Sequence, residues 1–291
     1  VQSTATFVEG VLMMHRHLHA VPLLLAIALG GAPVDAQPAR APVVSIEVGD
    51  YAFTKLPASI PAGWTRVRLV NRGTTLHHMQ LNKLADGRGV ADMLREFKPG
   101  APLPTWMTGA GGPSAAWAGQ SIEMLVNLEP GNYGVICWVP AADHQLHVQK
   151  GMIGRLTVVS RTTPDPVTAP RPTITIAAMD YNWSISAPVT RGPHVIRFDN
   201  RGPQPHELVV VRLAQGKTMV DAKDWAERGQ TGSSPGVMLS GVAALSPGKS
   251  AYVTNDFSPG RYALLCFVPD QKDRVGHPHV HYGMMKEFTV Q

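Results

Sequence analysis

The sequence has few charged residues and few cysteines, and it lacks a dense basic run. Only 16% of its 291 residues are charged and 44% are hydrophobic, which excludes a disordered or collagen-like chain. The formal net charge is +5, but Lys and Arg are scattered singly, so the sequence predicts no nucleic-acid partner. It also lacks a phosphate-binding loop, paired carboxylates and a recognisable Ser-His-Asp order, which argues against the enzyme classes that use them.

Long apolar runs are also missing, apart from one short run near the N-terminus. After Met13 the chain has a basic start at Arg16 and an apolar core over 20–31, and small residues then lead to Ala36. This pattern predicts a leader and secretory signal over residues 1–36 that is cut after Ala36. Because the core is too short to span a bilayer, we expect no stable membrane insertion. The expected location is exported, in the periplasm or outside the cell, where disulfides are allowed.

Glycine (28) and proline (25) are abundant, which favours short strands joined by turns. Much of the chain repeats: "DYAF" at Asp50 returns as "DYNW" at Asp180, and "LEPGNYGVICWVP" returns as "FSPGRYALLCFVP". Positions 77 and 137 each return 129 residues later with the same residue type. The repeat predicts two domains, residues 43–160 and 172–291, joined by a linker over 161–171 that is rich in proline and threonine.

Each copy is expected to be mostly β. The segments "TRVRLVN", "HVIRFDN", "SIEMLVNL" and "SAYVTNDF" alternate with period two, as half-buried strands do. One short helix is expected in each copy: the first has Val90, Leu94 and Phe97 on one face and ends at Pro99-Gly100, and the second follows Thr218 as its N-cap. The tyrosines of "PGNY" and "PGRY" resemble a tyrosine corner. The predicted fold class is all-β, with two tandem Greek-key β-sandwiches, each with a loop insertion carrying a short helix.

Strand parity predicts which polar side chains face the core. In "LHHMQLNK", His77 shares parity with the apolar Met79 and Leu81, so we expect it to point inward. The alternate positions are expected to face the other way: His78, Gln80 and Asn82. In the second copy His206 takes the inward position and Glu207 replaces His78.

A cysteine follows each inward histidine by sixty residues, and a second histidine and a methionine come soon after it. A thiolate and two imidazoles in a plane, with a weak axial thioether, suit copper that cycles between Cu(I) and Cu(II). Zinc is more often bound by Cys and His alone or with a carboxylate.

These loops resemble those of cupredoxins, the group of plastocyanin and azurin. "NRGTTLHH" and "NRGPQPHE" look like the first copper loop, while "YGVICWVPAADHQLHVQKGM" and "YALLCFVPDQKDRVGHPHVHYGM" look like the second. The resemblance covers both halves and implies one type 1 copper site in each. The implied ligands are His77, Cys137, His147 and Met152 in the first site and His206, Cys266, His279 and Met284 in the second.

The sequence leaves several alternatives open. His144 competes with His147, and His277 or His281 competes with His279; the shared spacing "H-V-x-x-G-M" favours His147 and His279. Nine and twelve residues separate Cys from His, which resembles the copper domains of two-domain nitrite reductases more than small cupredoxins. The two cysteines are also candidates for a disulfide, or for plain core residues.

The function implied by the resemblance is electron transfer with one or two copper ions and a redox protein partner, as a monomer or an oligomer. The alternative is a non-redox binding module or a copper storage or delivery protein. A copper oxidoreductase with an inter-subunit site is third. In such enzymes a histidine beside the cysteine leads to a second copper, but here the neighbours are Ile136 and Trp138 in one copy and Leu265 and Phe267 in the other. We therefore expect a carrier rather than an enzyme.

Overall fold

The computed structural model describes residues 40–96, 104–230 and 232–291. The predicted leader and signal over 1–36 lie outside the described residues. The first half contains β1 (Val43–Gly49), β2 (Ala52–Lys55), β3 (Ser59–Pro61), β4 (Gly63–Asn71), β5 (Gln80–Leu84), α1 (Val90–Glu96), β6 (Met107–Gly109), β7 (Ser121–Leu128), β8 (Gly131–Ile136) and β9 (Ile153–Val159). The second half contains β10 (Ile174–Met179), β11 (Asn182–Ile185), β12 (Gly192–Asn200), β13 (His206–Leu213), α2 (Met219–Glu227), β14 (Gly236–Leu245), β15 (Ser250–Phe257), β16 (Gly260–Leu265), the short 3₁₀ helix η1 (His279–Tyr282) and β17 (Met285–Val290).

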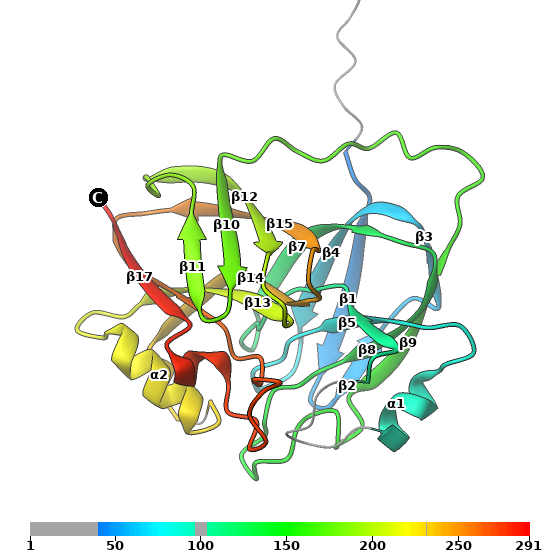
Figure 1. The fold of residues 1–291 in the computed structure, drawn as a ribbon, viewed down its shortest axis with the longest axis horizontal. Coiled ribbons are helices and arrows are strands. Elements are labelled where there is room, and N and C mark those ends of the chain that lie inside the picture. The colour runs from blue at the N-terminus through cyan, green and yellow to red at the C-terminus, as the bar shows by residue number, and fades with distance from the viewer. Residues whose placement is uncertain (1–39, 97–103, 231) are drawn as a thin grey trace, which may run out of the picture. The chain divides into compact units, whose positions relative to one another are not determined.

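Three sheets are formed (Figure 1). The largest has eight strands in the order β11-β10-β12-β15-β7-β4-β1-β2 and contains strands of both halves, since β7 meets β15 at Leu125 and Tyr252. A five-stranded sheet, β3-β9-β8-β5-β6, belongs to the first half, and a four-stranded sheet, β14-β13-β16-β17, belongs to the second. The predicted all-β fold of two sandwiches, each with a short inserted helix, is confirmed.

The alternating segments form the expected half-buried strands. In β7, Ile122, Met124 and Val126 are buried and point to the core, while Ser121 is exposed. Tyr133 and Tyr262 each donate a hydrogen bond to a backbone carbonyl four residues upstream, at 2.8 and 2.7 Å, as the tyrosine-corner resemblance implied. The domain boundaries 43–160 and 172–291 stay a prediction.

The second face of β5 is buried, which corrects one prediction from strand parity. His78, Gln80 and Asn82 are all buried rather than facing solvent. Gln80 Nε2 donates to the carbonyl of Ala244 in the other half at 2.9 Å, and an apolar cluster that includes Leu84 covers the same face further along. Parity correctly separated the two faces, but it did not show that both are covered.

The two helices differ in how well the sequence predicted them. α2 begins with the expected N-cap, where Thr218 and Asp221 form a reciprocal capping box. In α1 the predicted apolar face was wrong: Leu94 is 49% exposed, and Met93 is the buried residue. Phe97 and the predicted end at Pro99-Gly100 lie outside the described residues.

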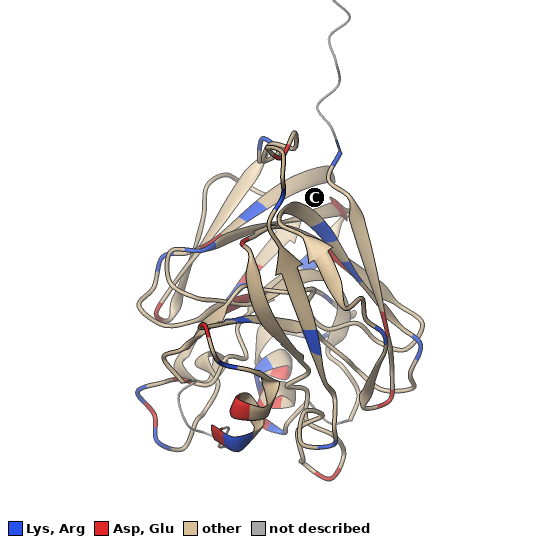
Figure 2. Ribbon diagram, turned by 90° about the vertical axis from the view of Figure 1, so that its right-hand side faces the viewer, with Lys and Arg blue, Asp and Glu red and all other residues tan. Residues whose placement is uncertain are grey.

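The halves share one continuous apolar core. Backbone hydrogen bonds also join them, including Gly111 N–H to the Ala244 carbonyl at 3.1 Å and Ala243 N–H to the Gly112 carbonyl at 2.8 Å. Basic and acidic residues are intermingled along the ribbon (Figure 2). None of the helices in the described part of the chain is long and apolar enough to cross a membrane.

Candidate metal centres

The first candidate centre brings together three of the predicted ligands. His77 lies just before β5, Cys137 directly after β8, and His147 in the loop that leads to β9. His77 Nδ1 is 3.1 Å from His147 Nδ1, which lies 3.5 Å from Cys137 Sγ. All three side chains are buried.

The second centre repeats this arrangement with His206, Cys266 and His279. The two Nδ1 atoms are again 3.1 Å apart, and Cys266 Sγ lies 3.4 Å from His279 Nδ1 and 3.9 Å from His206 Nδ1. Both cysteines are free and buried, so they are not paired in a disulfide.

The donor triangles have the size that a small transition-metal ion requires. Nitrogen at about 2.0–2.1 Å and thiolate sulfur at about 2.3 Å from one ion, at angles between tetrahedral and trigonal, lie roughly 3.3–3.8 Å apart. The N–N distance of 3.1 Å and the S–N distances of 3.4 to 3.9 Å come close to this range. The chemistry of two imidazoles and a thiolate, buried together, fits copper at one or two sites per chain.

The predicted axial methionines are placed beside each triangle by the backbone. Met152 N–H donates to the carbonyl of His147 at 2.9 Å, and Cys137 N–H donates to the carbonyl of Met152 at 3.3 Å. Met284 N–H likewise donates to the carbonyl of His279 at 3.0 Å. Both methionines are fully buried, so their thioethers lie in the same dry surroundings as the thiols.

Each cysteine sulfur also accepts a backbone hydrogen bond from the strand that carries the first histidine. His78 N–H lies 3.4 Å from Cys137 Sγ, and Glu207 N–H lies 3.5 Å from Cys266 Sγ. Such a bond stabilises a thiolate and lowers the sulfur's tendency to take up a proton. It also fixes the distance between the histidine strand and the cysteine strand.

Two carboxylates that the sequence reasoning missed hold the first histidine of each site. His77 Nε2 lies 3.2 Å from Asp50 Oδ1, and His206 Nε2 lies 2.8 Å from Asp180 Oδ1. A carboxylate accepts only, so Nε2 carries the proton in each ring and Nδ1 keeps its lone pair for a metal. The neighbouring tyrosines pack against the second histidine: Tyr51 on His147 at 4.9 Å and Tyr181 on His279 at 5.4 Å between ring centroids.

The repeated "DY" dipeptide is the sequence feature that marks these aspartates and tyrosines. It identified the repeat at Asp50 and Asp180, but nothing in its spacing linked it to histidines about 26 residues later. Only the closed sandwich brings the turn of the first hairpin of each half against the copper loops.

Burial keeps the imidazoles neutral. Desolvation, and then the neighbouring His77, lowers the pKa of His147 to about 4, and desolvation with His206 lowers that of His279 to about 4. Burial would raise the pKa of Asp180, yet hydrogen bonds from Gln204, Lys272 and His206 together lower it to about 2. At neutral pH the histidines therefore offer lone pairs, and the aspartate is charged.

The metal-free thiols are protonated at neutral pH. Burial raises the pKa of Cys137 to about 12, and burial followed by the Glu207 charge raises the pKa of Cys266 well above its ordinary value. A metal that binds as a thiolate complex must therefore displace a proton from each sulfur.

The alternative histidines lie outside both triangles. His144 is exposed on the loop surface. His277 pairs with Asp273 at 2.6 Å, and His281 is exposed and pairs with Glu227 at 2.8 Å; their rings stack on each other at 4.4 Å. The structure thus brings together His147 and His279, as the shared spacing favoured.

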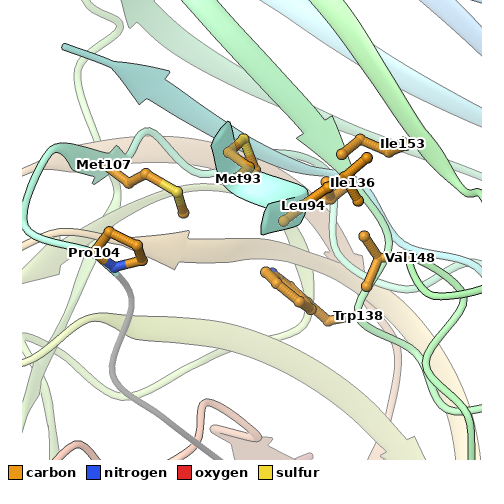
Figure 3. Close-up of a pocket in the computed structure, with 8 residues that line it drawn as sticks. All are labelled: Met93, Leu94, Pro104, Met107, Ile136, Trp138, Val148 and Ile153. Atoms are coloured by element: carbon orange, nitrogen blue, oxygen red, sulfur yellow. The ribbon is translucent and has the colours of Figure 1, made fainter. Parts of the chain in front are cut away.

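A shallow apolar hollow lies beside the first centre (Figure 3). It lies next to both neighbours of Cys137, Ile136 and Trp138, and next to Val148, which follows His147. The remaining lining residues are Met93, Leu94, Pro104, Met107 and Ile153. None of the eight residues offers an imidazole, carboxylate or thiolate to a further metal ion.

No protein-family model matches the chain, and no curated protein matches it. Reduced auracyanin of Roseiflexus castenholzii is 24% identical over 42% of this chain and 98% of its own, with a TM-score of 0.30. Auracyanin A, a blue copper protein of Chloroflexus aurantiacus, is 23% identical over 40% of this chain and 99% of its own, with a TM-score of 0.30. The copper-containing nitrite reductase of Thermus scotoductus SA-01 is 13% identical over 87% of this chain and 62% of its own, with a TM-score of 0.26. Because these TM-scores are below 0.5, the cupredoxin-like interpretation rests on the chain's own sandwiches and on its two His-Cys-His centres.

Proposed function

We propose that this protein is an exported electron carrier that holds up to two mononuclear type 1 copper ions. The observation that carries the proposal is the pair of buried donor triangles, His77-Cys137-His147 and His206-Cys266-His279. Each consists of two imidazole nitrogens and one cysteine sulfur, and each has a buried methionine bonded through the backbone to its second histidine. Bound copper would supply a one-electron couple at each site.

The chain's own groups suit reversible electron transfer. Asp50 and Asp180 hold the first imidazoles in one tautomer, and the sulfurs accept fixed backbone hydrogen bonds. The ligands come from β-strand ends and from buried loop positions in a closed core, so they move little when the charge of the site changes. A small structural change lowers the energy needed to gain or lose an electron.

The surroundings of the cysteines support a carrier over an enzyme. No histidine stands beside Cys137 or Cys266, and the hollow lined by Ile136 and Trp138, the chain neighbours of Cys137, is apolar. An oxidase or a nitrite reductase needs an open metal position that binds and activates its substrate. We propose that the partner is a redox protein. The N-terminal signal pattern supports placement in the periplasm or outside the cell.

One loading experiment tests the proposal. Purified protein is titrated with Cu(II), and both the visible spectrum and the copper content are measured. We expect an intense blue band from thiolate-to-copper charge transfer, saturation near two copper ions per chain and reversible reduction. Colourless, copper-free protein after reconstitution would contradict the proposal. Copper that binds without reversible reduction would favour storage or delivery, and steady turnover of nitrite or of O2 would favour an oxidoreductase.

A further inference from the structure

An aromatic chain leads away from the second copper centre. Phe267 directly follows Cys266, and its ring centroid lies 6.2 Å from that of Trp225 on α2, at an interplanar angle of 73°. The Trp225 ring in turn lies 6.3 Å from the ring of Trp117, at 46°. Rings at these separations are in or near van der Waals contact. Trp117 belongs to the first half of the sequence, so the chain crosses between the halves.

The far end of this aromatic chain reaches the first centre. Trp117 follows Ala116, which pairs with His77 in an antiparallel bridge. His77 N–H donates to the Ala116 carbonyl at 3.1 Å, and Ala116 N–H donates to the His77 carbonyl at 2.8 Å. A continuous path of covalent bonds, one backbone hydrogen bond and two ring contacts therefore joins His77 to Cys266.

Among the described residues the path is found on one side of the repeat, and the equivalent position on the other side differs. In the second copy Leu245 takes the place of Ala116 and pairs with His206. The residue equivalent to Trp117 is Ser246, whose hydroxyl accepts a hydrogen bond from Gly109 N–H at 2.8 Å. The route thus joins the histidine side of the first site to the cysteine side of the second, and its mirror image is interrupted by a serine.

Packing alone does not explain the choice of tryptophan at position 225. Its side chain is 1% exposed, and its indole N–H has no acceptor among the described residues. A buried donor without an acceptor lowers stability. Phenylalanine would fill the same apolar site without that cost. The larger ring extends the contact area toward both Trp117 and Phe267.

We propose that Phe267, Trp225 and Trp117 form the route by which one electron passes between the two copper sites; this inference rests on the proposed function, that both sites bind copper. The reduced site loses one electron and becomes Cu(II), and the oxidised site gains it and becomes Cu(I). No bond or proton changes place, and the rings mediate the transfer without being oxidised. The first electron comes from an external one-electron reductant, such as a redox protein. The two sites then act as a relay.

The test follows the electron inside single molecules. The protein with two copper ions is prepared with Met284→Gln, because a changed axial ligand shifts the absorption of the second site away from that of the first. A light-triggered reductant then delivers less than one electron per chain. Redistribution between the two blue bands should be first-order, at a rate independent of protein concentration. Trp225→Leu and Trp117→Leu should each slow it by roughly tenfold, a rate change that would equal about 1.4 kcal/mol if expressed as a free energy of activation.

Matched variants separate the route from general packing. Trp183 is also buried in the second half with an unbonded indole N–H, but its ring contact is with Phe198, and it lies off the route. Trp183→Leu should leave the redistribution rate unchanged. Trp225→Phe, which keeps an aromatic ring, should slow it less than Trp225→Leu. If the Trp225→Leu protein does not bind both copper ions, Trp117→Leu alone tests the route, because Trp117 is only half-buried and its replacement disturbs the core less.

Two further measurements keep the outcomes distinct. Pulsed electron paramagnetic resonance should give the same copper–copper distance in every variant. Indole emission should be quenched by copper at the second site, and less so in Trp225→Leu. Two bound copper ions with an unchanged redistribution rate in both leucine variants would overturn the relay and leave the proposed function intact. A chain that binds no copper would overturn both.

Discussion

The two metal centres share the same donor triangle but differ in what surrounds it. Directly after the first histidine, the first half has His78 and the second half has Glu207, and both are buried. Glu207 accepts a hydrogen bond from Phe267 N–H at 2.7 Å, whereas His78 Nδ1 has no partner among the described residues. A buried carboxyl beside Cys266 makes the second site more negative whenever that group is ionised, which stabilises Cu(II) relative to Cu(I).

The carboxylates that contact the first histidines also differ, and again the second site has the more buried acidic group. The Asp180 side chain is 10% exposed and bonds His206 at 2.8 Å, while that of Asp50 is 33% exposed and lies 3.2 Å from His77. Asp180 also accepts from Gln204 and Lys272, whereas Asp50 accepts from the exposed Thr74 and Thr75. The two halves therefore keep the same His-Cys-His triangle while the groups around it differ, as a relay between unequal sites would require.

Removing one sulfur at a time is the strongest way to test the separation of the sites. Cys137→Ser should abolish the blue band of the first site and reduce the copper content from two per chain toward one. Cys266→Ser should do the same for the second site, because each triangle has its own ligands. Visible spectra measure the two blue bands, and elemental analysis measures the copper content per chain. Met285→Leu, which changes the neighbour of a predicted ligand, serves as the control and should keep both bands. Loss of both bands from one cysteine change would show that the sites are not independent.

The outer carboxylates give a smaller, graded effect. Replacing a partner of a ligating histidine typically lowers metal affinity by about 10- to 100-fold. We expect Asp180→Asn to weaken copper binding at the second site more than Asp50→Asn weakens it at the first, because Asp180 is more buried and makes the shorter contact. Competition with a chelator, followed at each blue band, measures both. Equal losses, or a larger loss from Asp50→Asn, would refute the comparison.

Local pattern was enough to predict the sandwiches and the residues that meet in the two His-Cys-His triangles. Alternating segments became β4, β7, β12 and β15, and the capping signal at Thr218 became the start of α2. The recurrence of the spacing between His and Met selected His147 over His144, and the structure places His147 in the triangle. These features depend on residues that are close in sequence or repeated in register.

Contacts between distant segments account for what the sequence did not reveal. Gln80 and Asn82 have the alternation of a solvent-facing side, yet the second half and the insertion around α1 cover them. Leu94 was assigned to the apolar face of its helix, and only the position of α1 against β8 and β9 shows that Met93 faces inward. Asp50 and Trp117 carry no motif that links them to a histidine or to a helix in the other half.

The finest comparison concerns the equivalent pair His78 and Glu207 in metal-free protein. Burial raises the pKa of Glu207 from 4.5 to about 7, so its contribution to stability is present below pH 4.5 and is lost as the pH rises through 7. Burial lowers the pKa of His78 from 6.5 to about 4, so its contribution is present above pH 6.5 and is lost as the pH falls through 4. The two halves should therefore respond to pH in opposite directions at this position.

Two substitutions that remove the titrating group measure this difference. Glu207→Gln keeps an acceptor for Phe267 N–H and removes the titrating group, so the variant should gain in Tm relative to the parent protein between pH 5 and 8. The upper limit is about 3 kcal/mol, for the full displacement of one buried carboxyl, or several degrees in Tm. His78→Gln should instead reduce the loss of Tm on acidification from pH 6.5 to 4. His147 and His279, whose pKa values are also lowered to about 4, remain in both variants, so each is compared with the parent protein at the same pH. Parallel pH profiles for the two variants would show that position 78 and position 207 do not differ in the way that their burial implies.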